Sequence, residues 1–404
     1  MSPAPAAPDT LDPGRLGFTP QATPHGLAWW RTATIPPATW PPMPETAWAA
    51  ALGFAHRGPW VVLDLESTGR RLAARTYAFL VGVLEVHPQR PWQWRQWLLP
   101  HPADEAALWH HVAATWPADA VLVTYNGARF DLPLMHMRAQ MVGLWAPPWA
   151  GAQHVDVLSW VRRAFREAWP NYRLGTAAQR LVGLERPADD VPAASLPERY
   201  HHALLTRDVA PLAPAVSHHQ ADVLALAQVW LALARDLAQP PRARRYPAAT
   251  WLSRGRLYRQ YRDLPRARQA LRRAFRRATT PELRARAGLA LAAVQRQIGD
   301  RAAACAVWEA LAAEGVWEAY EHRIRAARRW DNDLEQARGW LRRAQAHLAA
   351  ASTSPLDRAL WQPKFQALAE RLGLTTEDVA TRPPDARSPS GPARNAADAP
   401  PEAR

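Results

Sequence analysis

The residues best suited to chemistry are two acids at the end of an apolar segment. Asp64 and Glu66 follow Val61-Val62-Leu63, a run that predicts a buried strand. Because side chains alternate along a strand, both acids point to one face, while Leu65 points into the core. Adjacent carboxylates repel each other unless a divalent cation lies between them, and oxygen ligands of this kind select Mg²⁺ or Mn²⁺. Surface acids at a strand end are the alternative interpretation.

Two further acids accompany expected helices. Asp131 follows an apolar strand and the Asn126-Gly127 turn, at the start of a helix. Helix N-termini favour acids, so capping would also explain its position. Asp222 comes four residues after His218, which places both on one helix face. The acid could then bind an ion while the histidine contacts the substrate water, and a solvated helix start is the alternative for His218.

The composition favours a polyanionic partner. The chain has 404 residues, 48% of them hydrophobic, and a formal net charge of +14. It can therefore bury two or three domain cores and attract nucleic-acid phosphates. All basic residues except Lys364 are arginine, so genome composition is an alternative source of the charge.

The single cysteine and the apolar runs restrict the class of protein. Cys305 alone excludes an internal disulfide framework and cysteine-based zinc sites. The first residues lack the features of a signal peptide, and no apolar run is long enough to span a bilayer. We therefore expect a cytoplasmic protein without a membrane partner.

Hydrophobic periodicity divides the chain into four parts. Residues 1–54 are rich in proline and tryptophan, which predicts an N-terminal arm without long regular elements. Residues 55–240 show three strands in succession, followed by alternating helices and strands, which predicts a mixed α/β domain. Residues 241–374 show only helical periodicity, and residues 375–404 show none and are expected to be disordered.

The elements expected in the α/β domain follow from the same periodicity. The expected strands cover residues 61–63, 77–83, 92–99 and 120–125. The expected helices cover residues 104–116, 132–142 and 156–166, and Asp222 lies in a further one that runs to about residue 237. A last helix of the helical domain is expected over residues 356–372.

A weak internal repeat marks the helical part. An aspartate precedes an alanine by four residues at Asp263, Asp300 and Asp333, with spacings of 37 and 33 residues. These spacings are close to the tetratricopeptide unit of roughly 34 residues, in which paired helices bury one another's apolar faces. Helical repeats commonly bind peptides, so a protein partner is one expectation for this part.

The helical part opens with a strongly basic stretch. Between residues 242 and 277 thirteen arginines meet one acid, Asp263. A platform that binds phosphates and feeds strands to the acids is one interpretation. A solvated helix face with arginine overuse is the other. Trp251, Tyr258 and Tyr261 could stack on bases, although we favour a core position for aromatic residues at helical spacing.

The order of these motifs resembles a known superfamily. The acid pair, the Asn126-Gly-x-x-Phe130-Asp131 segment and the His218-x-x-x-Asp222 segment resemble the DEDD superfamily of 3′-to-5′ exonucleases. More narrowly, residues 60–237, including Asp189-Asp190-Val191-Pro192, are similar to the YprB-type ribonuclease H-like exonuclease domain. Proteins of that type are also similar in having tetratricopeptide-like helices after the nuclease domain. The resemblance implies a ribonuclease H-like mixed sheet flanked by helices and followed by an all-α repeat domain.

The resemblance also implies a mechanism. The chain would hydrolyse phosphodiester bonds of DNA or RNA from single-stranded 3′ ends, with two Mg²⁺ or Mn²⁺ ions roughly 3.5–4 Å apart. One ion would activate water and the other would stabilise the leaving 3′ oxygen. Four carboxylates would hold the ions: Asp64, Glu66, Asp131 and Asp222.

The same resemblance gives a histidine the role of general base. His218 would orient or deprotonate the water, with His219 as the alternative. The superfamily's histidine class usually has four residues between histidine and aspartate, and its tyrosine class has three. This chain combines a histidine with the shorter gap.

Further candidates lie beside these motifs. Three arginines lie where the YprB-type pattern is rich in glycine, and they could grip a phosphate backbone; a lengthened solvated loop is the alternative. These arginines are Arg70, Arg71 and Arg75. Candidates at the substrate edge are Thr68, Asn126 and Phe130. Asp156 could support a metal ligand, although we favour helix capping for it.

Two other functions remain compatible with these residues. A catalytically silent scaffold could bind nucleic acid or protein through the helical repeats, although the complete set of acids argues against it. A structure-specific endonuclease would use the same metals. The sequence separates neither DNA from RNA nor exonuclease from endonuclease.

Overall fold

The computed structural model describes residues 11–36, 59–87, 90–185, 190–238 and 246–374. The chain divides into two compact units, Met1–Arg277 and Ala278–Arg404, and each is described by itself. Residues 375–404, for which we expected disorder, lie outside the described residues.

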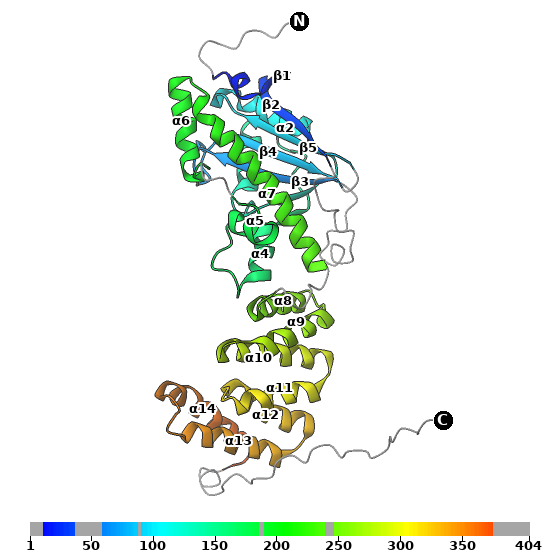
Figure 1. Ribbon diagram of the computed structural model, residues 1–404, viewed down its shortest axis with the longest axis vertical. Helices are drawn as coiled ribbons and strands as arrows, with labels where there is room; N and C mark the ends of the chain where they lie inside the picture. Colours follow the sequence, from blue (N-terminus) through cyan, green and yellow to red (C-terminus); the bar gives the residue numbers. More distant parts are fainter. Residues whose placement is uncertain (1–10, 37–58, 88–89, 186–189, 239–245, 375–404) are drawn as a thin grey trace, which may run out of the picture. The chain divides into compact units, whose positions relative to one another are not determined.

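A seven-stranded mixed sheet forms the first unit's centre (Figure 1). Strands β1 to β5 pair antiparallel, whereas β3, β6 and β7 run parallel to one another. The sheet confirms the expected mixed α/β class. Its strands in spatial order are β1 (Thr19–Thr23), β2 (Gly26–Ile35), β5 (Trp92–Leu98), β4 (Ala78–Val86), β3 (Trp60–Ser67), β6 (Val121–Thr124) and β7 (His154–Asp156).

Helices surround this sheet. The longer ones in the first unit are α2 (Glu105–Ala114), α3 (Asp131–Met141), α4 (Val157–Phe165), α5 (Leu174–Val182), α6 (Leu196–Thr206), α7 (Ala213–Ala238), α8 (Ala248–Gln260) and α9 (Leu264–Arg277). Short 3₁₀ turns are η1 (Pro13–Leu16), η3 (Pro102–Asp104), η4 (Ala193–Ser195) and η5 (Ala210–Leu212).

Two strands lie in the segment that we expected to lack long regular elements, and that prediction was wrong. Strand β2 has ten residues and pairs with β5, with Trp29 opposite Leu98. Its sequence contains no proline and is rich in aromatic and β-branched residues, which favour strands. The prolines that suggested an irregular arm begin at Pro36. Most of them, with Trp40, lie outside the described residues.

The two faces of the central strands carry different side chains. Val61, Leu63 and Leu65 are buried in a core with residues of α2, α3 and α6. The alternate residues of β3 face α7, where the rings of Trp60 and Trp230 lie 5.6 Å apart. By the same alternation, Asp64 and Glu66 lie on the α7 side of the sheet.

Helix α7 approaches the sheet most closely at Gly82 of β4. A Cβ atom at this position would lie 2.7 Å from Cε1 of His219. Gly82 is the partner of Asp64 in the antiparallel pairing of β3 with β4. The missing side chain therefore lets His219, and with it the first half of α7, lie directly over the acid strand.

Helix α8 packs on α4 of the α/β domain, α9 packs on α8, and both belong to the same compact unit. The Tyr261 ring, which follows α8, stacks on Trp160 of α4 at 5.1 Å. Trp251 and Tyr258 are buried, as the core interpretation required. The domain boundary that we expected after residue 240 falls among residues 239–245, outside the described residues, and compact packing continues to Arg277.

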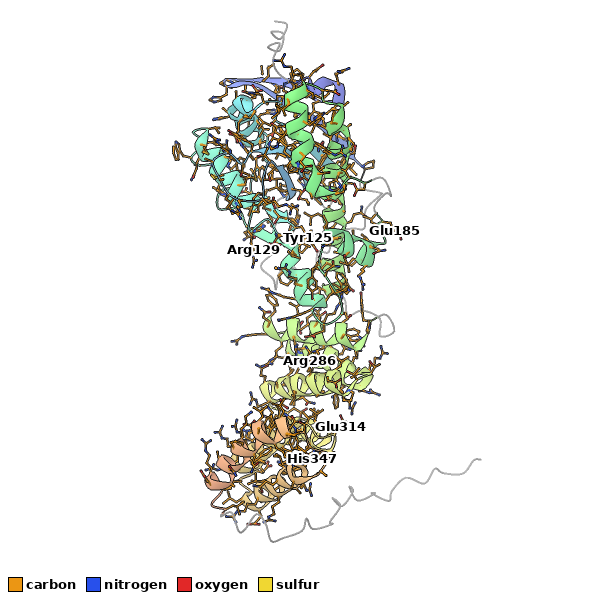
Figure 2. All side chains as sticks on the ribbon, turned by 90° about the vertical axis from the view of Figure 1, so that its left-hand side faces the viewer. Tyr125, Arg129, Glu185, Arg286, Glu314 and His347 are labelled. Atoms are coloured by element: carbon orange, nitrogen blue, oxygen red, sulfur yellow. The ribbon has the colours of Figure 1, made fainter. Side chains whose placement is uncertain are left out.

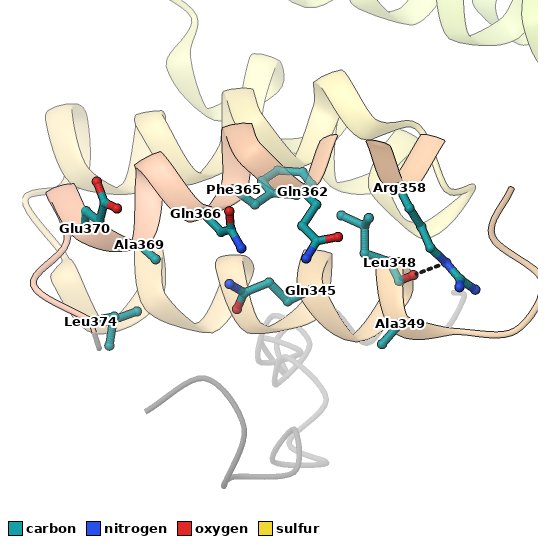
Figure 3. Close-up of a pocket in the computed structure, with 10 residues that line it drawn as sticks. All are labelled: Gln345, Leu348, Ala349, Arg358, Gln362, Phe365, Gln366, Ala369, Glu370 and Leu374. Atoms are coloured by element: carbon teal, nitrogen blue, oxygen red, sulfur yellow. Dashed lines mark hydrogen bonds between the residues drawn. The ribbon is translucent and has the colours of Figure 1, made fainter. Parts of the chain in front are cut away.

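The second unit is helical throughout its described residues, 278–374. Its helices are α10 (Pro281–Ile298), α11 (Arg301–Ala313), α12 (Trp317–Ala326), α13 (Leu334–Ala349) and α14 (Pro355–Arg371), with a π-helical turn over Ala327–Asp331. Consecutive helices pack against each other. Helices α13 and α14 border a pocket of about 820 Å³, which includes Gln345, Gln362 and Phe365 (Figure 3).

The aspartates of the sequence repeat share one structural role. The side chain of Asp263 accepts a hydrogen bond from the Arg266 backbone N–H near the start of α9 (3.1 Å). Asp300 and Asp333 cap α11 and α13 in the same way. The alanines that follow, Ala267, Ala304 and Ala337, are fully buried. The repeat is thus a capped helix start followed by a close helix contact, and its likeness to tetratricopeptide repeats stays a prediction.

Among the described residues, no helix is both long enough and apolar enough to cross a bilayer.

Replacing Gly82 with alanine should destabilise the first unit. The added methyl would force His219 and α7 away from the sheet, and overpacking of this kind costs about 1–3 kcal/mol. Urea unfolding of the full chain would measure the change.

Gly339→Ala is the control, since Gly339 lies within α13 and a Cβ there would meet nothing within 4 Å. Alanine at that helix position should be neutral or stabilising by up to about 1 kcal/mol. Equal stability of the two variants would contradict the close approach at Gly82.

Candidate active site

The candidate acids gather where the parallel strands end. Strands β3, β6 and β7 run in one direction, so their carboxyl ends meet at the same edge of the sheet. Asp64 and Glu66 lie in the second half of β3, and Asp156 is the last residue of β7. Asp131 begins α3, after the turn that leaves β6. Ligand sites of α/β sheets commonly form at this edge.

A buried hydrogen-bond chain ties α7 to Asp64. The Nε2–H of His219 donates to the backbone oxygen of Asp64 (3.0 Å). Its Nδ1 accepts from the side-chain amide of Gln96 on β5 (2.8 Å). The Gln96 oxygen in turn accepts from Nε of Arg31 on β2 (2.7 Å). Strands β2, β5 and β3 and helix α7 are therefore linked by one polar network.

His219 is held as a neutral ring. It is fully enclosed, and burial lowers its pKa to about 4. Both ring nitrogens are occupied by the network above, with Nε2 as the donor. The ring therefore positions the backbone of Asp64, and its nitrogens have partners other than a substrate water.

His218 faces a different set of partners. Its side chain is buried, and Nδ1–H donates to Oδ1 of Asp190 (2.7 Å). Its Nε2 lies 3.5 Å from Oδ2 of Asp222, one helical turn further along α7. A carboxylate on one nitrogen fixes the ring orientation and directs the other nitrogen toward the acid.

Asp131 lies in an electrostatically strained position. Its side chain is buried at the start of α3 and is 9% exposed. Burial, together with the nearby charge of Asp156, raises the pKa of Asp131 to about 7. A carboxylate whose charged form is disfavoured by burial in this way would be stabilised by a neighbouring cation.

Asp156 caps α4 and supports the turn before Asp131. Its Oδ1 accepts from the backbone N–H of Leu158 (3.1 Å) and of Asn126 (2.9 Å). Capping, the role that we favoured, is thus present in the structure. Asn126 is exposed and adopts a left-handed conformation with φ 71°. Its backbone is fixed by Asp156, while its side chain lies at the surface beside the acids.

The turn after β6 is tightly built. Gly127 donates its N–H to Oγ1 of Thr124 (3.2 Å), and a Cβ at Gly127 would lie 2.5 Å from that oxygen. Tyr125 (Figure 2) donates its hydroxyl to the backbone oxygen of Tyr172 (2.7 Å). Phe130, which precedes α3, packs partly against the core. These contacts set where α3 begins and hence where Asp131 lies.

An arginine-bearing loop joins β3 to β4 beside the acid pair. Arg70, Arg71 and Arg75 are exposed on it. Thr68 closes the loop, because its Oγ1 accepts from the backbone N–H of Tyr77 (3.0 Å) and its own N–H donates to the oxygen of Tyr77 (2.9 Å). The loop that follows the strand of Asp64 and Glu66 thus carries three cationic side chains at the surface.

A pocket of about 840 Å³ opens beside His218. Helices α5, α6 and α7 contribute to its wall, which is mainly apolar and includes Leu174, Val191 and Leu224. The charged or titratable side chains that line it are Glu185 (Figure 2), Asp190, Arg199, His218 and Asp222. An apolar space with a few polar groups at one wall is typical of a ligand site.

The donor set suits a hard divalent cation. Asp64, Glu66, Asp131 and Asp222 offer carboxylate oxygens, which Mg²⁺ and Mn²⁺ prefer, and such an ion would stabilise the buried charge of Asp131. Within the described parts of the chain, no three acidic, histidine or cysteine side chains already converge to hold a metal ion. Carboxylates without an ion between them repel each other, so binding would require these side chains to turn toward it.

The structure groups the residues singled out in the sequence unevenly. Asp64 and Glu66 share a strand face, and Asp222 is connected to that strand through the helix of His219. Asp131 lies close enough to Asp156 for the charge of Asp156 to raise the pKa of Asp131.

Two residues of the site were not identified as functional from the sequence. Asp190, the partner of His218, was noted only as part of a family segment. Gln96 is a polar residue in an expected strand, and nothing else in the sequence marked it.

Comparisons with known proteins agree with this arrangement. Residues 61–234 match the model of the RNase H superfamily. The uncharacterised protein YprB of Bacillus subtilis (strain 168) is 28% identical over 193 residues, which is 46% of this chain and 46% of that protein. The chain thus spans about half the length of this relative. The family match includes all four carboxylates and ends before α8. Residues 61–234 are therefore similar to the RNase H superfamily, in agreement with the mixed sheet and flanking helices described above.

Proposed function

We propose that the chain is a metal-dependent nuclease of the 3′-to-5′ exonuclease type, which hydrolyses phosphodiester bonds of DNA or RNA. The observation that carries the proposal is the placement of α7 on the acid strand. The Gly82–His219 contact lies opposite Asp64, and it brings the helix that bears His218 and Asp222 to the face of Asp64 and Glu66.

The four carboxylates would hold two Mg²⁺ or Mn²⁺ ions. When bound, such ions supply Lewis acidity for the attacking water and for the leaving 3′ oxygen. Asp64 and Glu66 approach from β3, Asp222 from α7 and Asp131 from the start of α3. The protein's contribution is to hold these oxygens on rigid elements before the substrate arrives.

His218 would take a proton from the attacking water. Asp190 holds Nδ1–H, which leaves Nε2 as the nitrogen directed to the acids. The distance of 3.5 Å between Nε2 and the Asp222 carboxylate is longer than a hydrogen bond. A water that lies to one side of this pair and contacts both groups could be oriented by both. Asp190 would act as a positioning residue, since it reaches the reaction only through the imidazole.

The substrate would be held by groups around the acids. Arg70, Arg71 and Arg75 present exposed positive charge beside β3 and would contact backbone phosphates. Thr68, Asn126 and Phe130 would lie at the substrate edge. The pocket beside His218 could enclose a nucleoside, because its apolar wall suits a base.

Removing two of the acids should abolish cleavage. The Asp131→Asn and Asp222→Asn double variant should lose on the order of 100-fold or more in rate, since two ligands for the ions lose their charge. The assay uses 5′-labelled single- and double-stranded DNA and RNA with Mg²⁺, Mn²⁺ or chelator. A ladder shortened from the 3′ end is expected in the metal lanes only.

Asp208→Asn is the matched control, because Asp208 is an exposed acid of the same unit, and it should retain full activity. Cleavage that persists in the double variant would refute the acid site. Wild-type protein that leaves every substrate intact would favour a scaffold. Cuts in a closed circular substrate would identify an endonuclease instead.

Asp190 and His218 should behave as one unit in kinetics. We expect Asp190→Asn and His218→Gln each to lower kcat by about 10- to 100-fold with a smaller effect on KM, because the imidazole loses its orientation or is absent. The double variant should be no slower than His218→Gln alone. Asp190→Glu should restore part of the rate.

Glu198→Gln serves as the control, since Glu198 is an exposed acid of α6 that does not line the pocket beside His218. Additive losses in the double variant would show that Asp190 acts independently of His218.

A further inference from the structure

Helix α9 presents two contrasting faces. Ala267, Ala270, Leu271 and Ala274 are buried, and Leu271 packs where a Cβ on Gly255 of α8 would clash, at 2.4 Å. The remaining surface is basic. Residues Leu264–Arg277 include six arginines and no acid. The helix is therefore anchored by its apolar side and leaves its positive side exposed.

Three of these arginines form a stripe along the helix. Arg268, Arg272 and Arg276, called the α9 stripe below, are spaced four residues apart and so lie along one helix face. Arg272 and Arg276 are exposed, and Arg268 is half-buried. Among the described residues, their side chains form no ion pair or hydrogen bond. Within the described parts of the chain, no acid therefore balances the positive charge of the stripe.

Other arginines of this chain are paired. Arg254 contacts Asp236, and Arg284 contacts Glu314. Arg323 contacts both Glu309 and Asp331. A composition rich in arginine explains how many there are, but it does not explain why one helix face gathers them without acids. Like charges four residues apart on a helix destabilise it modestly, and a bound polyanion would reverse that effect.

The stripe borders a shallow groove at the beginning of α9. The groove has a volume of about 380 Å³ and is lined by Pro265, Arg266, Arg268, Gln269 and Arg272. Its side chains are donors, except for proline. Arg266 is partly balanced by Asp263 at 3.3 Å, whereas Arg268 and Arg272 direct their charge to the groove wall. This chemistry matches an oxyanion such as a phosphate group.

Direct contacts connect this groove to the acid edge of the sheet. Tyr261, three residues before α9, stacks on Trp160 of α4, and its hydroxyl accepts from Arg163 (2.9 Å). Trp160 comes one helical turn after Asp156, the residue that caps α4. The start of α9 is thus joined through α4 to the turn that positions Asp131, within one compact unit.

We propose that the α9 stripe binds the phosphate backbone of a nucleic acid outside the acid site. Eight residues of helix rise about 12 Å, which corresponds to about three or four phosphates along one strand. The inference rests on the proposed function for its substrate class. It adds a second contact region, which supplies affinity without sequence preference and keeps the strand attached after each cleavage.

An acidic protein segment is the less suitable partner. Stable protein interfaces centre on aromatic or aliphatic anchors in desolvated pockets. The groove offers arginine, glutamine and proline, and the apolar residues of α9 are turned toward α8. A ligand recognised by repeating charge alone fits this surface better.

The test is binding of the full-length chain to labelled 20-nucleotide single-stranded DNA and RNA and to a 20-base-pair duplex. Binding is measured by fluorescence anisotropy in the presence of a chelator, which prevents metal-dependent cleavage. The variant Arg268→Gln, Arg272→Gln and Arg276→Gln should bind at least about tenfold more weakly. Its slope of log affinity against log salt should fall by about 2, since each phosphate contact on a single strand contributes about 0.7. Thermal melting confirms that the variant is folded.

The control changes the same number of charges elsewhere. Arg328, Arg329 and Arg371 are exposed in the second unit, and their replacement by glutamine should alter affinity less than twofold. An equal loss in this control, or an unchanged salt slope in the stripe variant, would overturn the proposal. Competition by polyglutamate as effective as that by unlabelled oligonucleotide would identify an acidic protein partner and overturn it as well.

Binding and cleavage give separate answers. The Asp131→Asn and Asp222→Asn variant should keep the salt slope of the wild type. If wild-type protein cleaves nothing but the stripe variant still loses affinity and slope, the nuclease proposal fails and the stripe proposal stands. If cleavage depends on the acids but the stripe variant binds like wild type, the nuclease proposal stands and the stripe proposal fails.

Discussion

The candidate site depends on the close approach of α7 to strand β4 at Gly82. Any side chain at this position would meet the ring of His219, and the helix would be held away from the sheet. Because Gly82 lies opposite Asp64, the contact occurs beside the acid pair itself. The packing of His219 on Gly82 therefore does more than stabilise a core. It also sets the position of Asp222 relative to the acids of β3.

Charge is arranged around that contact in layers. The innermost group, His219, is buried and neutral, with its hydrogen bonds supplied by Gln96 and by the backbone of Asp64. Around it lie carboxylates, and at Asp131 burial, together with the nearby charge of Asp156, raises the pKa. A neutral histidine in the innermost position adds no charge that would compete with cations for these acids.

Positive charge lies outside these layers. The loop after β3 carries three exposed arginines, and the α9 stripe carries three more. A polyanionic substrate is repelled by bare carboxylates and attracted by these cations, so an arrangement of acids inside and arginines outside can hold the strand while ions neutralise the centre. The same separation explains why net charge alone predicts a class of partner but not a site.

Local geometry explains what the sequence by itself determined. The alternation of β3 placed Asp64 and Glu66 on one face, and the aspartates at 300 and 333 cap helices because capping involves residues three apart. Tertiary structure alone decided the rest. Asp190 meets His218 across 28 residues, β2 joins the sheet through β5, and α8 packs on α4. Such contacts form between segments that are far apart in the sequence. The residue pattern of each segment carries no signal of its partner, so only the folded chain shows which segments meet.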